Sequence, residues 1–347
     1  MIAMQALVLE KPGKISIQDC QFAEVLGEND VQVKIHSVGI CGSDVHYYQH
    51  GRIGPFVVNA PMVLGHEAAG VVMAIGKNVR HLQVGDRVCM EPGIPDMQSQ
   101  QSRAGIYNLD PAVRFWATPP IHGCLRESVI HPAAFTFKLP DNVSFAEGAM
   151  VEPLAIGMHA ATKAAIKPGD IALVIGAGPI GVVTALAALA GGCSDVIICD
   201  LFAEKLQVAA NYEGLHAVNI KTGNLAQKVA ELTSGNGVDI VFECSGAKPA
   251  IGGVSEHIAP GGTAVLVGMP IDAAPMDIVA AQAKEVTFKT IFRYANMYPR
   301  TLRLLSSGKL RVQPLISQSF KFKDSVAAFE RAAAGHPTDI KIMLEME

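Results

Sequence analysis

The sequence is poor in charge, in aromatic side chains and in paired cysteines. Only 17% of its 347 residues are charged and 6% are aromatic, and 28 basic side chains stand against 32 acidic ones. No long run of one sign occurs, so a nucleic-acid partner or an anionic membrane surface is not expected. Half of the residues are hydrophobic, which excludes a disordered chain and, at about 150 residues per domain, predicts roughly two domains.

The seven cysteines are scattered, and none forms a Cys-x-x-Cys pair. The sequence therefore lacks the pattern of a disulfide framework. A basic-then-apolar signal segment is also missing at its start. We expect a cytoplasmic protein whose thiols are mostly buried.

One uncharged stretch, Ile171–Ser194, is long enough to span a membrane. Glycines and a proline interrupt its first third, at Gly176, Gly178, Pro179 and Gly181, directly after a short β-rich run. This pattern predicts a strand, a tight turn and a buried helix, so no membrane partner is expected.

Two parts of the chain differ in pattern. Up to about Glu152, short alternating apolar and polar stretches between glycines and prolines predict a small, partly open barrel. Beyond it, short apolar runs alternate with helical segments, which predicts a doubly wound parallel sheet of the α/β class. The expected strands are 31–36, 69–76, 86–91, 171–175, 196–199, 217–220, 239–243, 263–267, 286–292 and 340–344, and the expected helices are 203–212, 225–232, 298–306 and 325–334.

A nucleotide-binding loop is predicted where the first of these parallel strands ends. Gly176, Gly178 and Gly181 form a Gly-x-Gly-x-x-Gly pattern between a strand and a helix, which is the context that dinucleotide binding requires. The first glycine allows the tight turn, the second lets a pyrophosphate approach the backbone, and the third lets helix and strand pack closely. The helix N-terminus then offers free N–H groups to the phosphates.

An acidic residue follows at the spacing that ribose recognition needs. Asp200 lies 19 residues after Gly181, at the end of the next predicted strand. A carboxylate there accepts hydrogen bonds from the ribose hydroxyls and repels a 2′-phosphate, which favours NAD over NADP. Lys205 lies close enough to weaken this preference or to pack along the ribose.

A thiol, an imidazole and a carboxylate suggest a metal site in the first part of the chain. Cys41 follows a predicted strand, and His66 and Glu67 come about 25 residues later. These donors suit a borderline metal such as zinc. The residues alone leave a buried thiol and a core histidine as alternatives.

Three further patterns point to a family. They are Gly65-His66-Glu67-Ala68-Ala69-Gly70 with Gly76 beyond it, the segment Cys41–His46, and Gly85-Asp86-Arg87-Val88. Together with the nucleotide loop they resemble the zinc-containing medium-chain dehydrogenases over essentially the whole chain. The resemblance implies a GroES-like catalytic domain at 1–153 and 293–347 and a Rossmann NAD-binding domain at 154–292.

Within that family the chain resembles the polyol branch, the sorbitol and xylitol dehydrogenases. Alcohol dehydrogenases carry a third ligand cysteine near the domain junction, where this sequence has Val151-Glu152-Pro153-Leu154. The other matching stretches are Tyr47-Tyr48, Met90-Glu91-Pro92-Gly93, Phe115–Pro120 and Phe292–Asn296.

The resemblance also implies roles for individual residues. One catalytic zinc would be held by Cys41, His66 and Glu67. Glu152 would hold the zinc-bound water and contact substrate, or bind zinc directly in some states. Substrate would be bound by Tyr47, Phe115, Arg293 and Tyr294. A proton would leave through Ser43 and His46. Besides the glycines, Asp200 and Lys205, the cofactor would be contacted by Ile180, Val267, Met269 and Phe292.

The sequence departs from the family in one region. Many members hold a structural zinc with four cysteines there, and the segment from Pro92 to Gly123 contains no cysteine. We therefore expect no structural zinc and a lobe held together by packing. The side chains expected to pack are Ile106, Tyr107, Leu109, Val113, Phe115 and Trp116.

The expected activity is NAD-linked oxidation of a secondary hydroxyl of a sugar alcohol, xylitol or sorbitol, to a ketose. Another zinc dehydrogenase, such as threonine dehydrogenase, and a non-catalytic nucleotide-binding relative remain as alternatives. The expected partner is a small molecule, and the resemblance implies a homo-oligomer, either a dimer or a homotetramer.

Overall fold

The computed structural model describes residues 2–346 and divides into two compact units. The second unit includes residues 153, 293–297 and 307–315, whereas the bounds implied by the family resemblance assign them to the GroES-like domain. Unit 1 comprises Met1–Glu152, Tyr298–Ser306 and Ile316–Glu347, and unit 2 comprises Pro153–Met297 and Ser307–Leu315.

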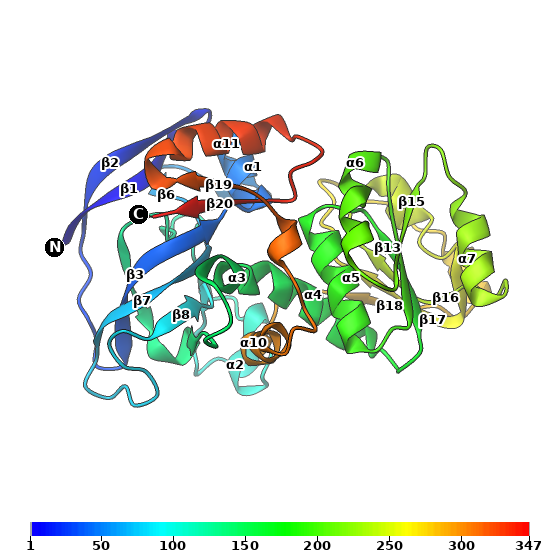
Figure 1. The fold of residues 1–347 in the computed structure, drawn as a ribbon, viewed down its shortest axis with the longest axis horizontal. Coiled ribbons are helices and arrows are strands. Elements are labelled where there is room, and N and C mark those ends of the chain that lie inside the picture. Colours follow the sequence, from blue (N-terminus) through cyan, green and yellow to red (C-terminus); the bar gives the residue numbers. More distant parts are fainter. Residues whose placement is uncertain (1, 347) are drawn as a thin grey trace. The chain divides into compact units, whose positions relative to one another are not determined.

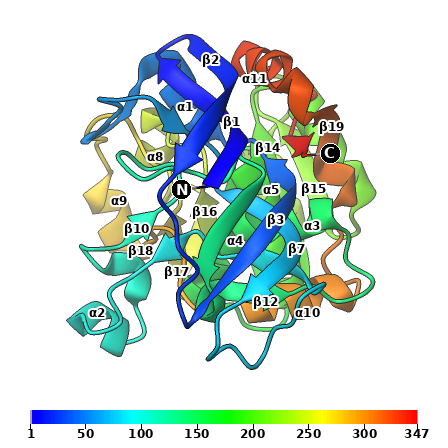
Figure 2. The ribbon, with the colours of Figure 1, turned by 90° about the vertical axis from the view of Figure 1, so that its left-hand side faces the viewer.

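Unit 1 is built from β-sheets. The largest sheet has the order β12-β8-β7-β3-β20-β19, and β11 pairs with residues 30–34 of β3. Figure 2 shows β3 and β7 running side by side. Its strands are β3 (Asp30–Gly39), β7 (Glu67–Ile75), β8 (Arg87–Met90), β11 (Ser128–Pro132), β12 (Thr136–Lys138), β19 (Ile316–Lys321) and β20 (Lys341–Glu345). The remaining strands are β1 (Ile2–Lys11), β2 (Lys14–Phe22) and β6 (Met62–Val63) in one sheet, with two small pairs, β4 (Arg52–Ile53) with β5 (Phe56–Val57) and β9 (Gly93–Ile94) with β10 (Arg114–Phe115).

The alternation predicted over 31–36 is confirmed in β3. Val31, Val33 and Ile35 are fully buried, whereas the residues between them are partly or fully exposed. This face belongs to the hydrophobic core of unit 1. The helices of unit 1 are α1 (Gly42–His50), α2 (Gln100–Arg103), α3 (Phe145–Ala149), α10 (Tyr298–Ser306) and α11 (Ser325–Ala334).

Unit 2 contains a parallel sheet of six strands in the order β15-β14-β13-β16-β17-β18. This is the doubly wound order 3-2-1-4-5-6, and α5 and α7 lie on opposite sides of the sheet (Figure 1). The predicted α/β class is therefore confirmed. The strands are β13 (Ile171–Ile175), β14 (Asp195–Asp200), β15 (Leu215–Asn219), β16 (Val238–Glu243), β17 (Ile258–Leu266) and β18 (Thr287–Thr290). The helices are α5 (Pro179–Gly191), α6 (Ala203–Leu206), α7 (Leu225–Thr233), α8 (Lys248–Gly252) and α9 (Ile278–Ala283), after α4 (Val151–Ala164), which begins at the end of unit 1.

One predicted helix is wrong. The segment 203–212 forms α6 and then a 3₁₀ turn over Gln207–Asn211. The side-chain amide of Asn211 donates to the backbone oxygen of Val208 at 3.1 Å. Such local side-chain bonds compete with helical ones, which accounts for the tighter winding.

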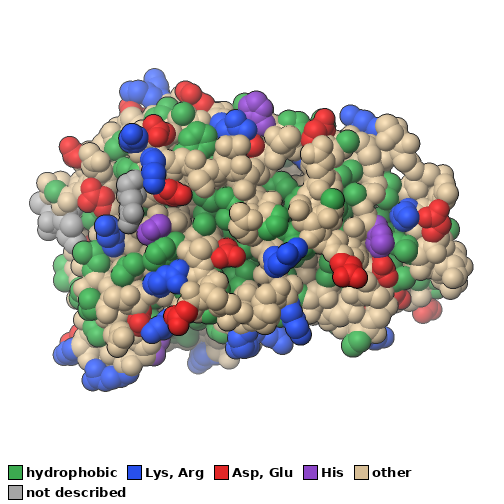
Figure 3. Space-filling model, in the orientation of Figure 1, with side chains coloured by type: hydrophobic (Ala, Val, Ile, Leu, Met, Phe, Trp, Pro, Cys, Tyr) green, Lys and Arg blue, Asp and Glu red, His purple; other side chains and the backbone are tan. Residues whose placement is uncertain are grey.

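The uncharged stretch Ile171–Ser194 folds as β13, the glycine loop and α5, as predicted. Within residues 2–346, no helix combines the length and hydropathy that crossing a membrane requires. Basic and acidic side chains are interspersed on the face drawn in Figure 3. That face therefore lacks the single-sign patch typical of nucleic-acid binding.

Candidate functional site

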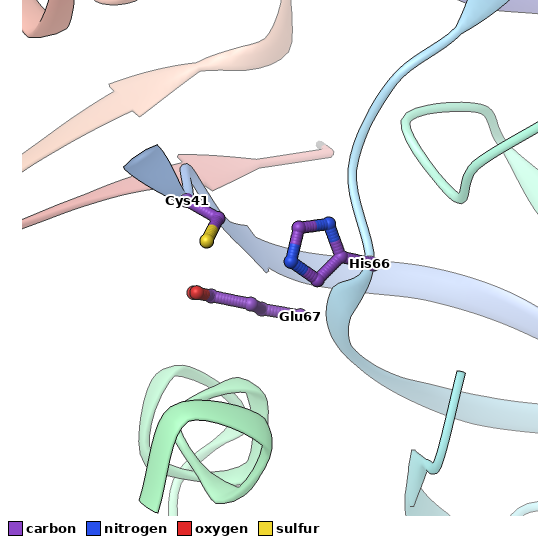
Figure 4. A group of neighbouring side chains, drawn as sticks. All are labelled: Cys41, His66 and Glu67. Atoms are coloured by element: carbon purple, nitrogen blue, oxygen red, sulfur yellow. The ribbon is translucent and has the colours of Figure 1, made fainter. Parts of the chain in front are cut away.

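Three side chains of unit 1 converge on one point. The Cys41 Sγ, a ring nitrogen of His66 and a carboxylate oxygen of Glu67 all lie within 4.8 Å of one another. Figure 4 shows these three side chains pointing toward one another from two separate segments. His66 and Glu67 are buried and Cys41 is half-buried, so one side of the cluster remains reachable.

A buried carboxylate ties the two segments together. Cys41 precedes α1, and its backbone N–H donates to Oδ2 of Asp44 at 3.2 Å. Oδ1 of Asp44 accepts the backbone N–H of Gly65 at 3.0 Å. Gly65 has φ +88°, a conformation that favours glycine. Asp44 therefore fixes the turn that presents His66 relative to the start of α1.

His66 also faces the carboxylate of Asp44. Its Nδ1 lies 3.5 Å from Oδ2 of Asp44. Burial lowers the pKa of His66, but the charges of Asp44 and Cys41 outweigh burial and leave the pKa well above its usual value. Nδ1 has no hydrogen-bond partner among the described residues, so the Asp44 carboxylate acts on this side of the ring through its charge, and Nε2 is left for a ligand.

Glu67 begins β7 and lies opposite Gly39 in the ladder with β3. A Cβ added at Gly39 would overlap Oε2 of Glu67, so the carboxylate packs directly against the Gly39 backbone. Both Glu67 oxygens accept from Nζ of Lys341 at 2.7 Å. Burial alone lowers the pKa of Lys341, but Glu67 and Cys41 outweigh it, so that pKa is raised.

The donor set fits a zinc ion. A thiolate, an imidazole and a carboxylate are the ligand types that zinc takes, and three protein ligands with a fourth position open are typical of catalytic sites. As anions, Cys41 and Glu67 would supply two negative charges, which balance the charge of a Zn²⁺ ion. The buried Lys341 ammonium changes this balance by adding a positive charge beside Glu67.

Two further buried carboxylates belong to the same region of unit 1. Glu152 starts α4 and acts electrostatically on both Lys341 and Glu91. Burial raises the pKa of Glu91 to about 7, although the hydroxyl of Tyr107 donates to it at 2.7 Å. The charge of Glu152 acts in the same direction as burial.

The predicted proton-transfer and pocket residues of unit 1 lie on or near α1. Ser43, His46 and Tyr47 are in this helix, and Tyr47 is buried. The ring of His46 lies 4.6 Å from that of the exposed His50. Phe115, at the end of β10, packs against His66 with ring centroids 5.7 Å apart, so it borders the cluster.

The cysteine-free lobe is organised only partly as expected, because Phe115 and Trp116 are buried but two other side chains are not. Ile106 and Leu109 are 41% and 49% exposed, so they do not form its core. Instead the buried carboxylate of Asp110 accepts the backbone N–H groups of Asp96 and Ala112, at 2.6 and 3.1 Å. The Asp110 carboxylate therefore holds this loop by hydrogen bonds to its backbone, in addition to the packing of Phe115 and Trp116.

The glycine loop of unit 2 has the predicted local geometry. Gly176 has φ +102° and follows β13. Gly178 caps α5, and nothing lies within 4 Å of a Cβ built on it, so its surface is open to a ligand. A Cβ at Gly181 would collide with the carbonyl oxygen of Gly176. Ile180, the second residue of α5, is half-buried beside this loop.

Asp200 is held at the end of β14, next to the glycine loop. Its Oδ2 accepts the backbone N–H of Ala177 at 2.8 Å, and its Oδ1 accepts that of Phe202 at 3.0 Å. Lys205 lies over the ring of Phe202, with its Nζ 5.3 Å from the ring centroid. The carboxylate therefore has a fixed position beside the expected phosphate-binding turn.

The other predicted cofactor and substrate residues of unit 2 follow later strands. Val267 follows β17, and its backbone N–H donates to the backbone oxygen of Glu243. Met269 is exposed. Phe292, Arg293 and Tyr294 follow β18. Arg293 has φ +53° and its guanidinium lies 5.0 Å from the Phe292 ring centroid. These residues lie at the carboxyl ends of strands, where doubly wound sheets bind ligands.

Sequence reasoning assigned no role to Asp44, Glu91 or Lys341. Asp44 and Glu91 lie inside motifs that we quoted, so a buried carboxylate next to ligand residues could have been suspected. Lys341 is different, because it lies 274 residues from Glu67 and only strand pairing brings the two together.

Comparisons with known proteins agree with this geometry. Residues 27–141 match the alcohol dehydrogenase GroES-like domain, and residues 179–307 match the zinc-binding dehydrogenase domain. A D-xylulose reductase of Morganella morganii is 80% identical over 331 residues, covering 95% of this chain and 98% of that protein. Sorbitol dehydrogenase of Rattus norvegicus is 42% identical, covering 99% and 96% of the two chains. A solved oxidoreductase of unknown specificity from Escherichia coli is 35% identical, with a TM-score of 0.94 and full coverage of both chains.

Proposed function

The chain belongs to the polyol branch of the zinc-containing medium-chain dehydrogenases, and we propose that it interconverts xylitol and D-xylulose with zinc and NAD. The observation that carries the proposal is the convergence of Cys41, His66 and Glu67 in unit 1. The name of the relative that is 80% identical over most of the chain supports xylulose as the ketose. Neither relative named above gives support to a threonine dehydrogenase.

Cys41, His66 and Glu67 would hold the zinc. When bound, zinc supplies a Lewis acid that lowers the pKa of a substrate hydroxyl, and NAD supplies the hydride acceptor. The chain's own residues bind and orient the polyol. Phe115 and Tyr47 would border the carbon chain, Glu152 would accept a hydrogen bond from a substrate hydroxyl, and Arg293 and Tyr294 would bind further hydroxyls.

The proton released in oxidation needs a route to water. Ser43 and His46 lie three residues apart on α1, and therefore on one face of the helix. His50 continues that face and is exposed. We assign Ser43 and His46 to proton transfer, with His50 at the end of the path that meets solvent.

NAD would bind at the carboxyl ends of β13, β14 and β17. Gly176, Gly178 and Gly181 would accommodate the pyrophosphate, and the free N–H groups of α5 would face it. Asp200 would bind the ribose hydroxyls. Further contacts would come from Ile180, Lys205, Val267, Met269 and Phe292.

We further propose a cytoplasmic homo-oligomer, a dimer or a tetramer, with a single catalytic zinc per chain. All seven cysteines are free in the part of the chain that the structure describes, as is usual in a reducing compartment. The single-zinc proposal rests on the cysteine-free segment from Pro92 to Gly123. The Asp110 hydrogen bonds provide that lobe with a metal-free means of holding its shape.

A polyol panel tests the proposed substrate. The purified protein is mixed with NAD and either xylitol, sorbitol, 2,3-butanediol or threonine, and NADH is followed by its absorbance. We expect the highest kcat/KM with xylitol, because the polar residues above suit a hydroxyl-rich chain. Equal or higher kcat/KM with threonine or butanediol would reject the assignment.

Cofactor choice gives a prediction about Asp200. Asp200→Ala combined with Leu201→Arg should shift the NADP-to-NAD ratio of kcat/KM by about 10- to 100-fold toward NADP. This fold-change corresponds to the free energy of roughly one charge-assisted hydrogen bond. The variant should also lose activity with NAD, because Asp200 anchors the backbone of Ala177. Asp195→Ala, at the opposite end of β14, is the matched control and should leave the ratio unchanged. A wild type that uses both cofactors equally would contradict the role of Asp200.

A further inference from the structure

Lys341 is a buried cation at the metal cluster for which the proposed function has no use. It lies in β20 and is 2% exposed. Pairing of β20 with β3 brings it beside Glu67, since Met343 lies opposite Gly39 and Gly39 lies opposite Glu67. Its ammonium donates to both Glu67 oxygens at 2.7 Å and to the backbone oxygen of Ile40 at 3.2 Å.

We propose that Lys341 is a positioning residue that competes with the metal for the Glu67 carboxylate and so makes Glu67 the exchangeable member of the ligand set. The inference rests on the proposed function, because it takes Cys41, His66 and Glu67 as the metal ligands. Beyond that function, Lys341 would set how tightly Glu67 binds the metal.

Competition follows from the hydrogen bonds and from the charges. Both Glu67 oxygens are engaged by one ammonium, so any metal bound to this carboxylate shares it with Lys341. The pair is almost fully buried, with side-chain exposures of 2% and 1%. Water therefore screens little of the repulsion between the ammonium and a divalent cation at the cluster.

The orientation of Glu67 does not depend on Lys341 alone. The ladder between β3 and β7 fixes its backbone, and the Gly39 backbone lies directly against its carboxylate. Removing the ammonium therefore mainly removes a competing positive charge.

Lys341 donates its hydrogen bonds to Glu67 and Ile40 and none to Cys41 or His66, although the charge of Cys41 also acts on its ammonium. His66 faces the carboxylate of Asp44, an anion that favours a cation nearby. Cys41 receives its fixed position from the hydrogen bond between its backbone and Asp44. We therefore expect Cys41 and His66 to stay bound to the metal and Glu67 to be the ligand that exchanges.

Zinc binding to the metal-free protein tests this inference without substrate or NAD. Lys341→Met keeps the length of the side chain and removes its charge, and Lys341→Arg keeps the charge. Lys321→Met is the matched control, because Lys321, in the neighbouring strand β19, pairs at the surface with Glu345 of β20. The zinc dissociation constant and the rate of zinc loss are measured by competition with a chromogenic chelator, and folding is followed by near-ultraviolet circular dichroism.

We expect Lys341→Met to lower the zinc dissociation constant at least ~10-fold and to slow zinc loss, since a like charge is removed from a poorly screened site. Lys341→Arg keeps the positive charge beside Glu67, and Lys321→Met changes a lysine outside the cluster, so both should stay within about 3-fold of wild type. A folded Lys341→Met protein with unchanged or weaker zinc binding would overturn the inference. Equal tightening by Lys341→Arg would overturn it too, because the charge would then be irrelevant.

A second pair of variants serves if Lys341→Met does not fold. Glu67→Gln removes the carboxylate charge but keeps the ammonium, and the double variant Glu67→Gln/Lys341→Met removes both. The double variant should bind zinc at least ~10-fold more tightly than Glu67→Gln alone; equal affinities would reject the repulsion between the Lys341 ammonium and the metal on which the inference rests. A protein that fails to oxidise polyols yet gives these zinc affinities would disprove the proposed substrate and leave the role of Lys341 intact.

Discussion

Cys41→Ser should lower the kcat/KM for xylitol by about 100- to 1000-fold, the usual effect of losing a preorganised electrostatic group at a reacting oxygen. A serine hydroxyl is a far poorer zinc ligand than a thiolate. Cys41 lies in the short connection between β3 and α1. Zinc per chain, measured by elemental analysis after dialysis, should fall together with activity.

A second cysteine variant controls for the effect of a Cys→Ser substitution in itself. Cys20→Ser makes the same change in β2 of the same unit, outside the metal cluster. We expect it to keep zinc and activity. If Cys41→Ser keeps both as well, the three-residue cluster is not the metal site.

Glu152→Gln should lower kcat by about 10- to 100-fold, as loss of a carboxylate next to a metal site typically does. Glutamine preserves the shape of this buried side chain at the start of α4 but removes its charge. The KM for NAD should change little, because the nucleotide loop and Asp200 belong to unit 2 and are untouched. Steady-state kinetics with varied xylitol and varied NAD separate the two effects.

Glu330→Gln is the control for this variant, because Glu330 is an exposed carboxylate on α11 of unit 1. It should behave as wild type. A Glu152→Gln enzyme with normal kcat would remove this carboxylate from the proposed substrate contacts.

Local patterns explain why much of the fold was predictable. The β-rich run, the three glycines and the apolar helix after them are consecutive, so their geometry depends on neighbours in sequence. The strict alternation in β3 likewise depends on which face is buried. The helix predicted over 203–212 ends at Leu206 and continues as a 3₁₀ turn, in which the Asn211 side chain donates to the backbone oxygen of Val208.

The candidate metal ligands were predictable in identity but not in their surroundings. Cys41, His66 and Glu67 lie in short motifs, and the resemblance to a family named them. Lys341 lies in no motif, and a lysine in a strand is ordinarily exposed. Its burial follows from the pairing of β20 with β3, which the sequence does not show. The role of Asp110 could not be predicted either, because its hydrogen bonds to the backbone of Asp96 and Ala112 form only once the loop is folded.

Zinc titration of the metal-free protein tests the central claim, that one zinc held by Cys41, His66 and Glu67 is needed for polyol oxidation. Metal is removed with a chelator, the fold is checked by circular dichroism, and zinc is added back while xylitol-dependent NADH formation is measured. We predict that the stripped protein stays folded and inactive, and that activity rises linearly and saturates at one zinc per chain. Full activity without zinc, saturation only at two zinc ions per chain, or unfolding on removal of the metal would contradict the account.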